Sequence, residues 1–170
     1  MSRAFLKEST LEEPEVRPPG LSALPAGARN LMTPEGLARL RERLAGLAAL
    51  RAERSREAGE EARRELMLLD ERIRPLERSV RTAEAVAPPP PAERDRVRFG
   101  AAVAVRDPQG SESRYRIVGV DEADPERGDI SYLSPLARAL INRRAGEKAT
   151  VASPRGPLAL EVVSVSYGPT

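Results

Sequence analysis

Apolar residues recur at helical spacing in two stretches of the chain. The first series follows a helix-start signal, Thr33-Pro34-Glu35, and consists of Leu37, Leu40, Leu44 and Leu47. The second series consists of Leu66, Leu69, Ile73, Leu76, Val80 and Ala83. In both series the spacing alternates between three and four residues, which places the members on one narrow face of a helix. We therefore predict two amphipathic helices, each with an apolar seam too narrow to be stable alone.

The two seams match each other as the two sides of an antiparallel hairpin. Residues that face each other in such a hairpin have position numbers with a constant sum. The sum is 120 for the pairs Leu37–Ala83, Leu40–Val80, Leu44–Leu76 and Leu47–Ile73. The turn is then expected near residues 59–60, where Gly59 can adopt the left-handed conformation that ends a helix. The sequence predicts an antiparallel coiled-coil hairpin over residues 33–87.

The pattern changes on either side of this hairpin. Residues 1–32 hold four prolines and no periodicity, which predicts a disordered or extended tail. Four successive prolines predict a stiff linker over residues 88–92. Beyond it, short alternating segments predict strands at 97–105, 114–120, 129–133, 149–152 and 158–167, with one short helix at 135–142. We expect an α+β fold of two domains, the second being a small antiparallel sheet with one helix over residues 93–170.

The composition narrows the possible chemistry. The chain has 170 residues with no cysteine and no histidine, which removes cysteine nucleophiles, the commonest general base and the commonest metal ligand. Only five aromatic residues occur: Phe5, Phe99, Tyr115, Tyr132 and Tyr167. An aromatic-walled ligand pocket is hard to build from so few. Any catalysis must therefore rest on carboxylates, lysine, arginine, tyrosine or hydroxyls.

The charge pattern narrows the possible partners. The net charge is +2, and residues 33–86 hold 12 Arg interleaved with 11 Asp and Glu. This pattern is typical of a solvated helix surface and argues against strong direct DNA binding. No apolar run approaches the length needed to span a membrane. The first ten residues lack the apolar segment of a secretory signal, so we expect a cytoplasmic protein with no membrane partner.

Several segments resemble the Gre family of bacterial transcript-cleavage and elongation factors. The segments RFGAAVAV, RYRIVGVDEADPERGDISYLSPLARALINRRAGEKATV and VVSVSY are similar to the GreB-type C-terminal domain. The most specific run is Ile130–Leu140, followed by Gly146-Glu147. TPEGLARLRERL and LLDERIRPLERSV resemble the two helices of the family's arm. The resemblance covers roughly residues 31–168.

The resemblance implies a fold, a partner and a contact site. It also implies a regulator of RNA polymerase that is not itself an enzyme and has no metal or cofactor of its own, any Mg²⁺ being the polymerase's. In Gre-type proteins an FKBP-like globular domain grips the rim of the secondary channel of RNA polymerase, and the helical hairpin enters that channel. By resemblance, Leu133, Ser134, Pro135 and Leu136 lie in the part that contacts the polymerase. Ser134 and Pro135 also suit a helix cap and first turn, and both interpretations can hold together. The seam is satisfied within the hairpin, so we expect a monomer.

The hairpin tip departs from the family pattern. Cleavage-competent members carry an Asp and a Glu three residues apart, which help to hold a second Mg²⁺ in the polymerase site. Motif matching lays residues 53–58 on that pattern and puts Arg56 in place of the Glu. The hairpin register instead makes Glu57, Glu60 and Glu61 the candidate tip acids. Acids also favour a helix N-terminus without any metal.

Arm length gives a second reason to doubt cleavage. The arm is several helical turns shorter than the family pattern, so its tip falls short by about 10 Å at ~1.5 Å per residue. Mg²⁺–oxygen distances are only about 2.1 Å. The sequence therefore favours a regulator of elongation that occupies the channel without stimulating cleavage. The alternative is an active cleavage factor whose rearranged acidic tip helps to hold the polymerase's Mg²⁺. Prolyl isomerase activity and a self-associating scaffold are further alternatives.

Overall fold

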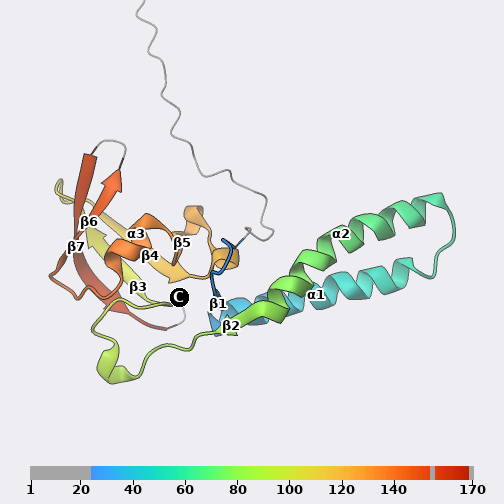
Figure 1. Cartoon of the computed structure of the whole chain (residues 1–170), viewed down its shortest axis with the longest axis horizontal. Coiled ribbons are helices and arrows are strands. Elements are labelled where there is room, and N and C mark those ends of the chain that lie inside the picture. The colour runs from blue at the N-terminus through green and yellow to red at the C-terminus, as the bar shows by residue number, and fades with distance from the viewer. Residues whose placement is uncertain (1–23, 154–155, 169–170) are drawn as a thin grey trace, which may run out of the picture.

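The computed structural model describes residues 24–153 and 156–168, which form a helical hairpin that projects from a globular domain (Figure 1). The hairpin consists of α1 (Pro34–Arg54) and α2 (Glu60–Thr82). None of the helices in this part of the chain is long and apolar enough to cross a membrane. The predicted α+β fold of two parts is confirmed.

The hairpin is held together along the predicted seam. Thr33 caps α1, because its side chain accepts a hydrogen bond from the Gly36 N–H at 3.0 Å, and Pro34 follows at the first helical position. The buried seam residues are Leu47, Leu69, Ile73 and Leu76, with Leu40 and Leu44 packed against them. Toward the tip, ion pairs join Arg51 to Asp70 and Arg54 to Glu65. These cross-helix pairs fit the predicted register, in which residues 51 and 69, and 54 and 66, face each other.

The turn differs in detail from the prediction. The first helix ends at Arg54, where Ser55 closes the last turn in a right-handed conformation. Gly59 does not end that helix but stands before the first residue of α2, with a φ of 123°. Glycine adopts such a φ without steric cost, and here the freedom serves to start the second helix. The loop between the helices therefore consists of residues 55–59.

The base of the hairpin also differs from the prediction. The second helix stops at Thr82, and β2 (Ala83–Ala85) pairs in parallel with β1 (Asn30–Met32). The structure corrects two predictions, since Ala83 begins a strand and does not continue the helical seam, and residues 30–32 form a strand and are not part of the tail. Asn30 is drawn into the fold because its side-chain amide donates to the backbone oxygen of Ser79 and to the Thr82 hydroxyl, both at 3.1 Å. The rest of the predicted tail, residues 1–23, lies outside the described residues.

The globular domain is a curled five-stranded sheet with the strand order β5-β4-β3-β7-β6. Its strands are β3 (Ala102–Arg106), β4 (Glu112–Val118), β5 (Asp129–Ser131), β6 (Lys148–Ser153) and β7 (Gly156–Ser166). All neighbours are antiparallel, as predicted, except β4 and β5, which are parallel. The parallel pair is possible because residues 119–128 cross over between them through two short turns, η2 (Val120–Glu122) and η3 (Pro125–Arg127).

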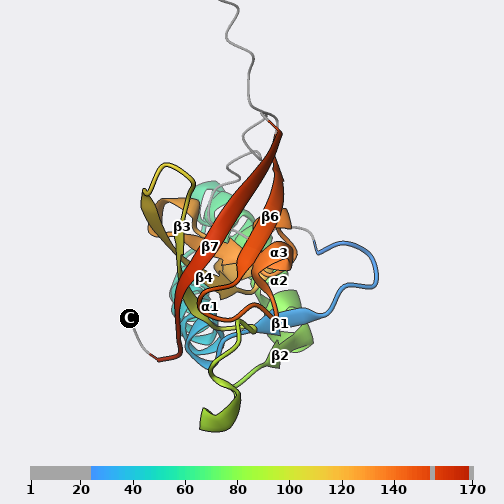
Figure 2. The ribbon, with the colours of Figure 1, turned by 90° about the vertical axis from the view of Figure 1, so that its left-hand side faces the viewer.

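One short helix, α3 (Pro135–Leu140), packs on the sheet beside β6 (Figure 2). The core between them consists of Val97, Ala101, Val103, Val105, Ile117, Ala137, Leu140, Ala149, Leu160 and Val162. The predicted proline linker is not extended throughout, since a short turn, η1 (Pro91–Glu93), begins within it. The Arg94 side chain donates to the Pro89 backbone oxygen at 3.0 Å and stabilises this bend.

Candidate functional site

The acids at the hairpin tip are engaged by arginines. Arg54 donates a hydrogen bond to Glu57 at 2.9 Å and forms an ion pair with Glu65 at 3.0 Å. The hydrogen bond to Glu57 is the largest cause of a raised Arg54 pKa, so this side chain stays charged. On the first turn of α2, Glu60 pairs with Arg64 at 3.6 Å. Two of the three candidate tip acids thus have a guanidinium partner.

The tip acids do not form a metal-binding group. Among residues 24–153 and 156–168, no three or more Asp, Glu, His or Cys side chains are placed to hold a metal ion together. The structure therefore does not bring Glu57, Glu60 and Glu61 together as ligands. A tip that directs carboxylates to Mg²⁺ needs oxygens within about 2.1 Å of one point.

The segment that resembles the family's polymerase contact surrounds the start of α3. Ser134 caps this helix, since its hydroxyl oxygen accepts a hydrogen bond from the Ala137 N–H at 3.1 Å. Pro135 follows at the first helical position and is exposed, whereas Leu136 packs against the core of the globular domain. Leu133 is half-buried, and its N–H donates to the Ser131 hydroxyl at 3.2 Å. The cap orients the turn and leaves the Pro135 ring available for contact.

Tyr132 ties this segment to the base of the arm. Its hydroxyl donates to the Arg29 backbone oxygen at 2.5 Å, one residue before β1. Its ring also meets Phe99 edge-to-face, with the ring centroids 5.8 Å apart. The sequence placed Tyr132 among five aromatics and within the run Ile130–Leu140, but indicated no role for it. A contact between residues 103 positions apart leaves no signal in a single sequence.

A second tie to the arm comes from Glu122, which sequence reasoning also missed. The Glu122 carboxylate accepts hydrogen bonds from the Thr33 N–H at 2.8 Å, from the Thr33 hydroxyl, and from the Gly119 N–H at 3.1 Å. Its side chain is only 6% exposed. A carboxylate of the globular domain is therefore buried against the first residue of the arm.

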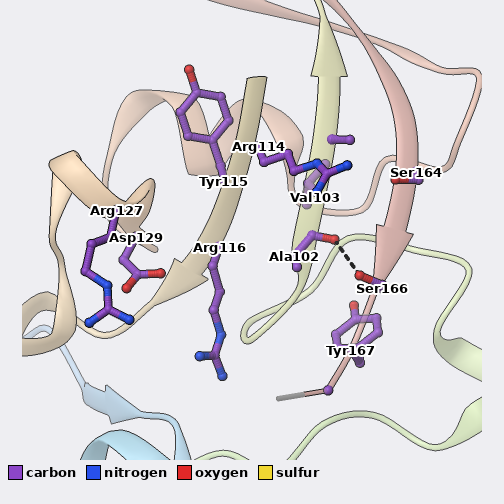
Figure 3. A pocket seen from close by; sticks show the side chains of 12 residues that line it. Ala102, Val103, Arg114, Tyr115, Arg116, Arg127, Asp129, Ser164, Ser166 and Tyr167 are labelled. Atoms are coloured by element: carbon purple, nitrogen blue, oxygen red, sulfur yellow. Dashed lines mark hydrogen bonds between the residues drawn. The ribbon is translucent and has the colours of Figure 1, made fainter. Parts of the chain in front are cut away.

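A shallow cavity of about 510 Å³ lies on the sheet (Figure 3). Its lining includes small residues such as Ala102 and Ser166. It also includes charged residues such as Arg116 and Asp129. Tyr115 and Tyr167 are its only aromatic residues. Two tyrosines do not make the aromatic pocket that prolyl isomerisation would need, so the cavity gives no support to that alternative.

The comparisons with known proteins decide the family. The family model "Transcription elongation factor, GreA/GreB, C-term" matches residues 91–167. The transcription elongation factor GreB of Pseudomonas aeruginosa is 36% identical over 168 residues, covering 90% of this chain and 96% of that protein. This chain belongs to the GreA/GreB family. The resemblance stated from the sequence is thereby confirmed.

Other similar proteins match a shorter part of the chain or have a lower sequence identity. The transcription elongation factor GreA of Hyphomonas neptunium is 51% identical over 73 residues, or 42% of this chain and 46% of that protein. The crystal structure of GreA factor homolog 1 of Thermus thermophilus covers 82% of this chain and 99% of its own, with 21% identity and a TM-score of 0.39. The segment 133–136 lies inside the matched C-terminal region, and the hairpin lies outside it. As a transcription elongation factor, a member of this family acts as a regulator, which fits the expectation that the chain is not itself an enzyme.

Proposed function

We propose that this GreA/GreB-family chain binds RNA polymerase at the secondary channel and regulates elongation without stimulating transcript cleavage. The observation that supports the lack of cleavage stimulation is the pairing of acids with arginines at the tip. Arg54 pairs with Glu57, and Arg64 pairs with Glu60. A carboxylate paired with a guanidinium must give up that partner before it can bind a cation. The protein would act in the cytoplasm as a monomer.

The grip on the polymerase is assigned to the turn from Leu133 to Leu136. Pro135 is exposed there on a turn that the Ser134 cap holds in place. An apolar ring on a rigid turn loses little conformational entropy on binding. The arm that this grip presents is short, because the 21 residues of α1 span about 32 Å at ~1.5 Å per residue.

The alternative is a cleavage factor that uses Glu57, Glu60 and Glu61 after rearrangement. The observation in its favour is that the ion pairs at the tip are exposed. Exposed pairs are worth about 0–1 kcal/mol, so they can break when a stronger ligand such as Mg²⁺ is offered. A decisive experiment must therefore measure cleavage directly.

The experiment uses backtracked elongation complexes of the cognate polymerase and the full-length chain. Binding is measured by competition against a labelled copy of the same protein, and RNA cleavage is followed on a gel. We expect competition with no cleavage above the polymerase's own rate, and loss of competition in Pro135→Glu. The matched control Pro108→Glu changes an exposed proline in the β3–β4 turn and should compete normally. Strong cleavage that disappears when Glu57, Glu60 and Glu61 are all changed to Ala would establish the alternative instead.

A further inference from the structure

We propose that Glu122 is a positioning residue that fixes the direction of the arm relative to the globular domain. The consequence for transcription rests on the proposed function, because direction matters only if the arm enters a channel. The positioning itself is a property of the free protein and can be measured without the polymerase.

The first observation is the set of donors around the Glu122 carboxylate. Two of its three donors, the N–H and the hydroxyl of Thr33, belong to the residue that caps α1. The third, the Gly119 N–H, belongs to the globular domain. Arg39, on the first turns of α1, approaches the same carboxylate at 3.9 Å. A negative charge at a helix N-terminus is stabilised by the helix dipole. Glu122, a residue of the globular domain, therefore binds the N-terminus of the first arm helix.

The second observation is the lack of space around this contact. A Cβ on Gly36 would lie 1.8 Å from a Glu122 carboxylate oxygen, and one on Gly119 would lie 2.1 Å from the Leu31 backbone oxygen. Neither glycine has a positive φ, so close approach of the two domains, and not backbone conformation, requires glycine here. At Gly119 the nearest atom belongs to the backbone and cannot move aside, so residues 119–122 lie in close contact with the base of the arm.

The third observation is that the neighbouring residue holds the other helix. Asp121 accepts a hydrogen bond from the hydroxyl of Ser79, which is buried in the last turns of α2. The short turn η2 thus contacts the first residue of one arm helix and the end of the other. Contacts on two different helices restrict a swing of the arm more than either contact alone, and Tyr132 adds a contact at Arg29, just before β1. The linker of residues 88–92 is not needed for this constraint.

The length of the arm amplifies any looseness at this base. A swing of about 10° would move the tip of an arm about 32 Å long by roughly 5–6 Å, given ~1.5 Å rise per residue. A tip displaced by that distance contacts different groups in a channel. Loss of the Glu122 contact should therefore change what the arm does without removing the grip of the globular domain.

The test measures the distance between two spin labels in the full-length chain. Because the sequence has no cysteine, Arg56→Cys in the hairpin turn and Gln109→Cys in the β3–β4 turn give two unique and exposed sites. We expect one narrow distance distribution in this labelled parent. Glu122→Ala should broaden the distribution at least twofold, and Glu122→Gln should broaden it less, since one amide oxygen can still accept from Thr33. The control Glu126→Ala, an exposed acid on η3, should leave it unchanged.

Gly36→Ala provides an independent variant, because it pushes a methyl group into the same contact from the arm side. Unchanged distributions in both Glu122→Ala and Gly36→Ala would overturn the proposal. If Glu122→Ala fails to fold, as judged by circular dichroism, then Glu122→Gln and Gly36→Ala decide in its place. With the polymerase, the folded variants should compete within about threefold of the parent and lose at least tenfold of its effect on elongation. If the parent has no effect on the polymerase, the proposed function fails while the distance result still stands.

Discussion

Replacement of Leu76 by Ala tests whether the hairpin seam supports the whole molecule. Leu76 is 2% exposed and belongs to the buried cluster with Leu47, Leu69 and Ile73. The change removes three carbon atoms, which is worth about 2.4 kcal/mol at ~0.8 kcal/mol per buried methylene. A residual cavity would add to this, with Leu→Ala changes in cores costing about 2–5 kcal/mol. The hairpin core is only two helices wide and can close around the gap, so we expect a loss of about 2.5–3 kcal/mol.

Urea denaturation followed by circular dichroism measures this loss, with Leu50→Ala as the matched control. Leu50 lies on the same arm but is 39% exposed, so its replacement should cost less than about 1 kcal/mol. The contacts of residues 121–122 join the hairpin to the globular domain, and we therefore expect one transition with an unchanged slope. Equal losses in the two variants would refute the packing argument. A separate early transition in Leu76→Ala would refute the coupling of the two parts.

Three further predictions concern the turn, the junction and the tip. Gly59→Ala should destabilise the protein by about 1 kcal/mol or more, because alanine is strained at a φ of 123°, and urea unfolding measures it. Burial raises the pKa of Asp121 in the folded protein, so the stability linked to its protonation is complete below the ordinary pKa and declines as pH rises through the raised value. Asp121→Asn should therefore become more stable relative to the parent as pH increases, and a difference that shrinks instead would contradict the assignment. Arg54→Ala should leave RNA cleavage at background in the backtracked-complex assay, because freeing Glu57 alone does not assemble a metal site.

A cleavage factor and a regulator that only occupies the channel need different properties of the arm. A cleavage factor must place oxygens within about 2.1 Å of a metal ion. A regulator that blocks a channel needs only bulk at the correct angle. The arginine-paired tip and the buried base contact of Glu122 both suit the second requirement.

Local periodicity let the sequence alone predict the hairpin, its register and most strands. The seam from Leu37 to Leu76 repeats over short sequence distances, and Thr33 marks the start of α1. Gly59 indicated the region of the turn, although it precedes α2 and does not end α1. The C-terminal segments were sufficient to identify the family, which the comparisons confirmed. The exact limits of α1 and α2 did not follow from the sequence, because helix ends depend on caps and on the path of the chain beyond them.

Only the tertiary structure decided how the arm is joined to the globular domain. Asn30 pairs with Ala83 across two helices, and Glu122 meets Thr33 across 89 residues of chain. Such contacts depend on where both partners lie in the folded chain. No local pattern around either residue identifies its partner. The pairing of Arg54 with Glu65 at the tip also depends on the fold, because it crosses from α1 to α2, whereas Arg54 and Glu57 are only three residues apart in the sequence. The sequence determined that this protein has an arm, and the tertiary contacts determined its direction and the state of its tip.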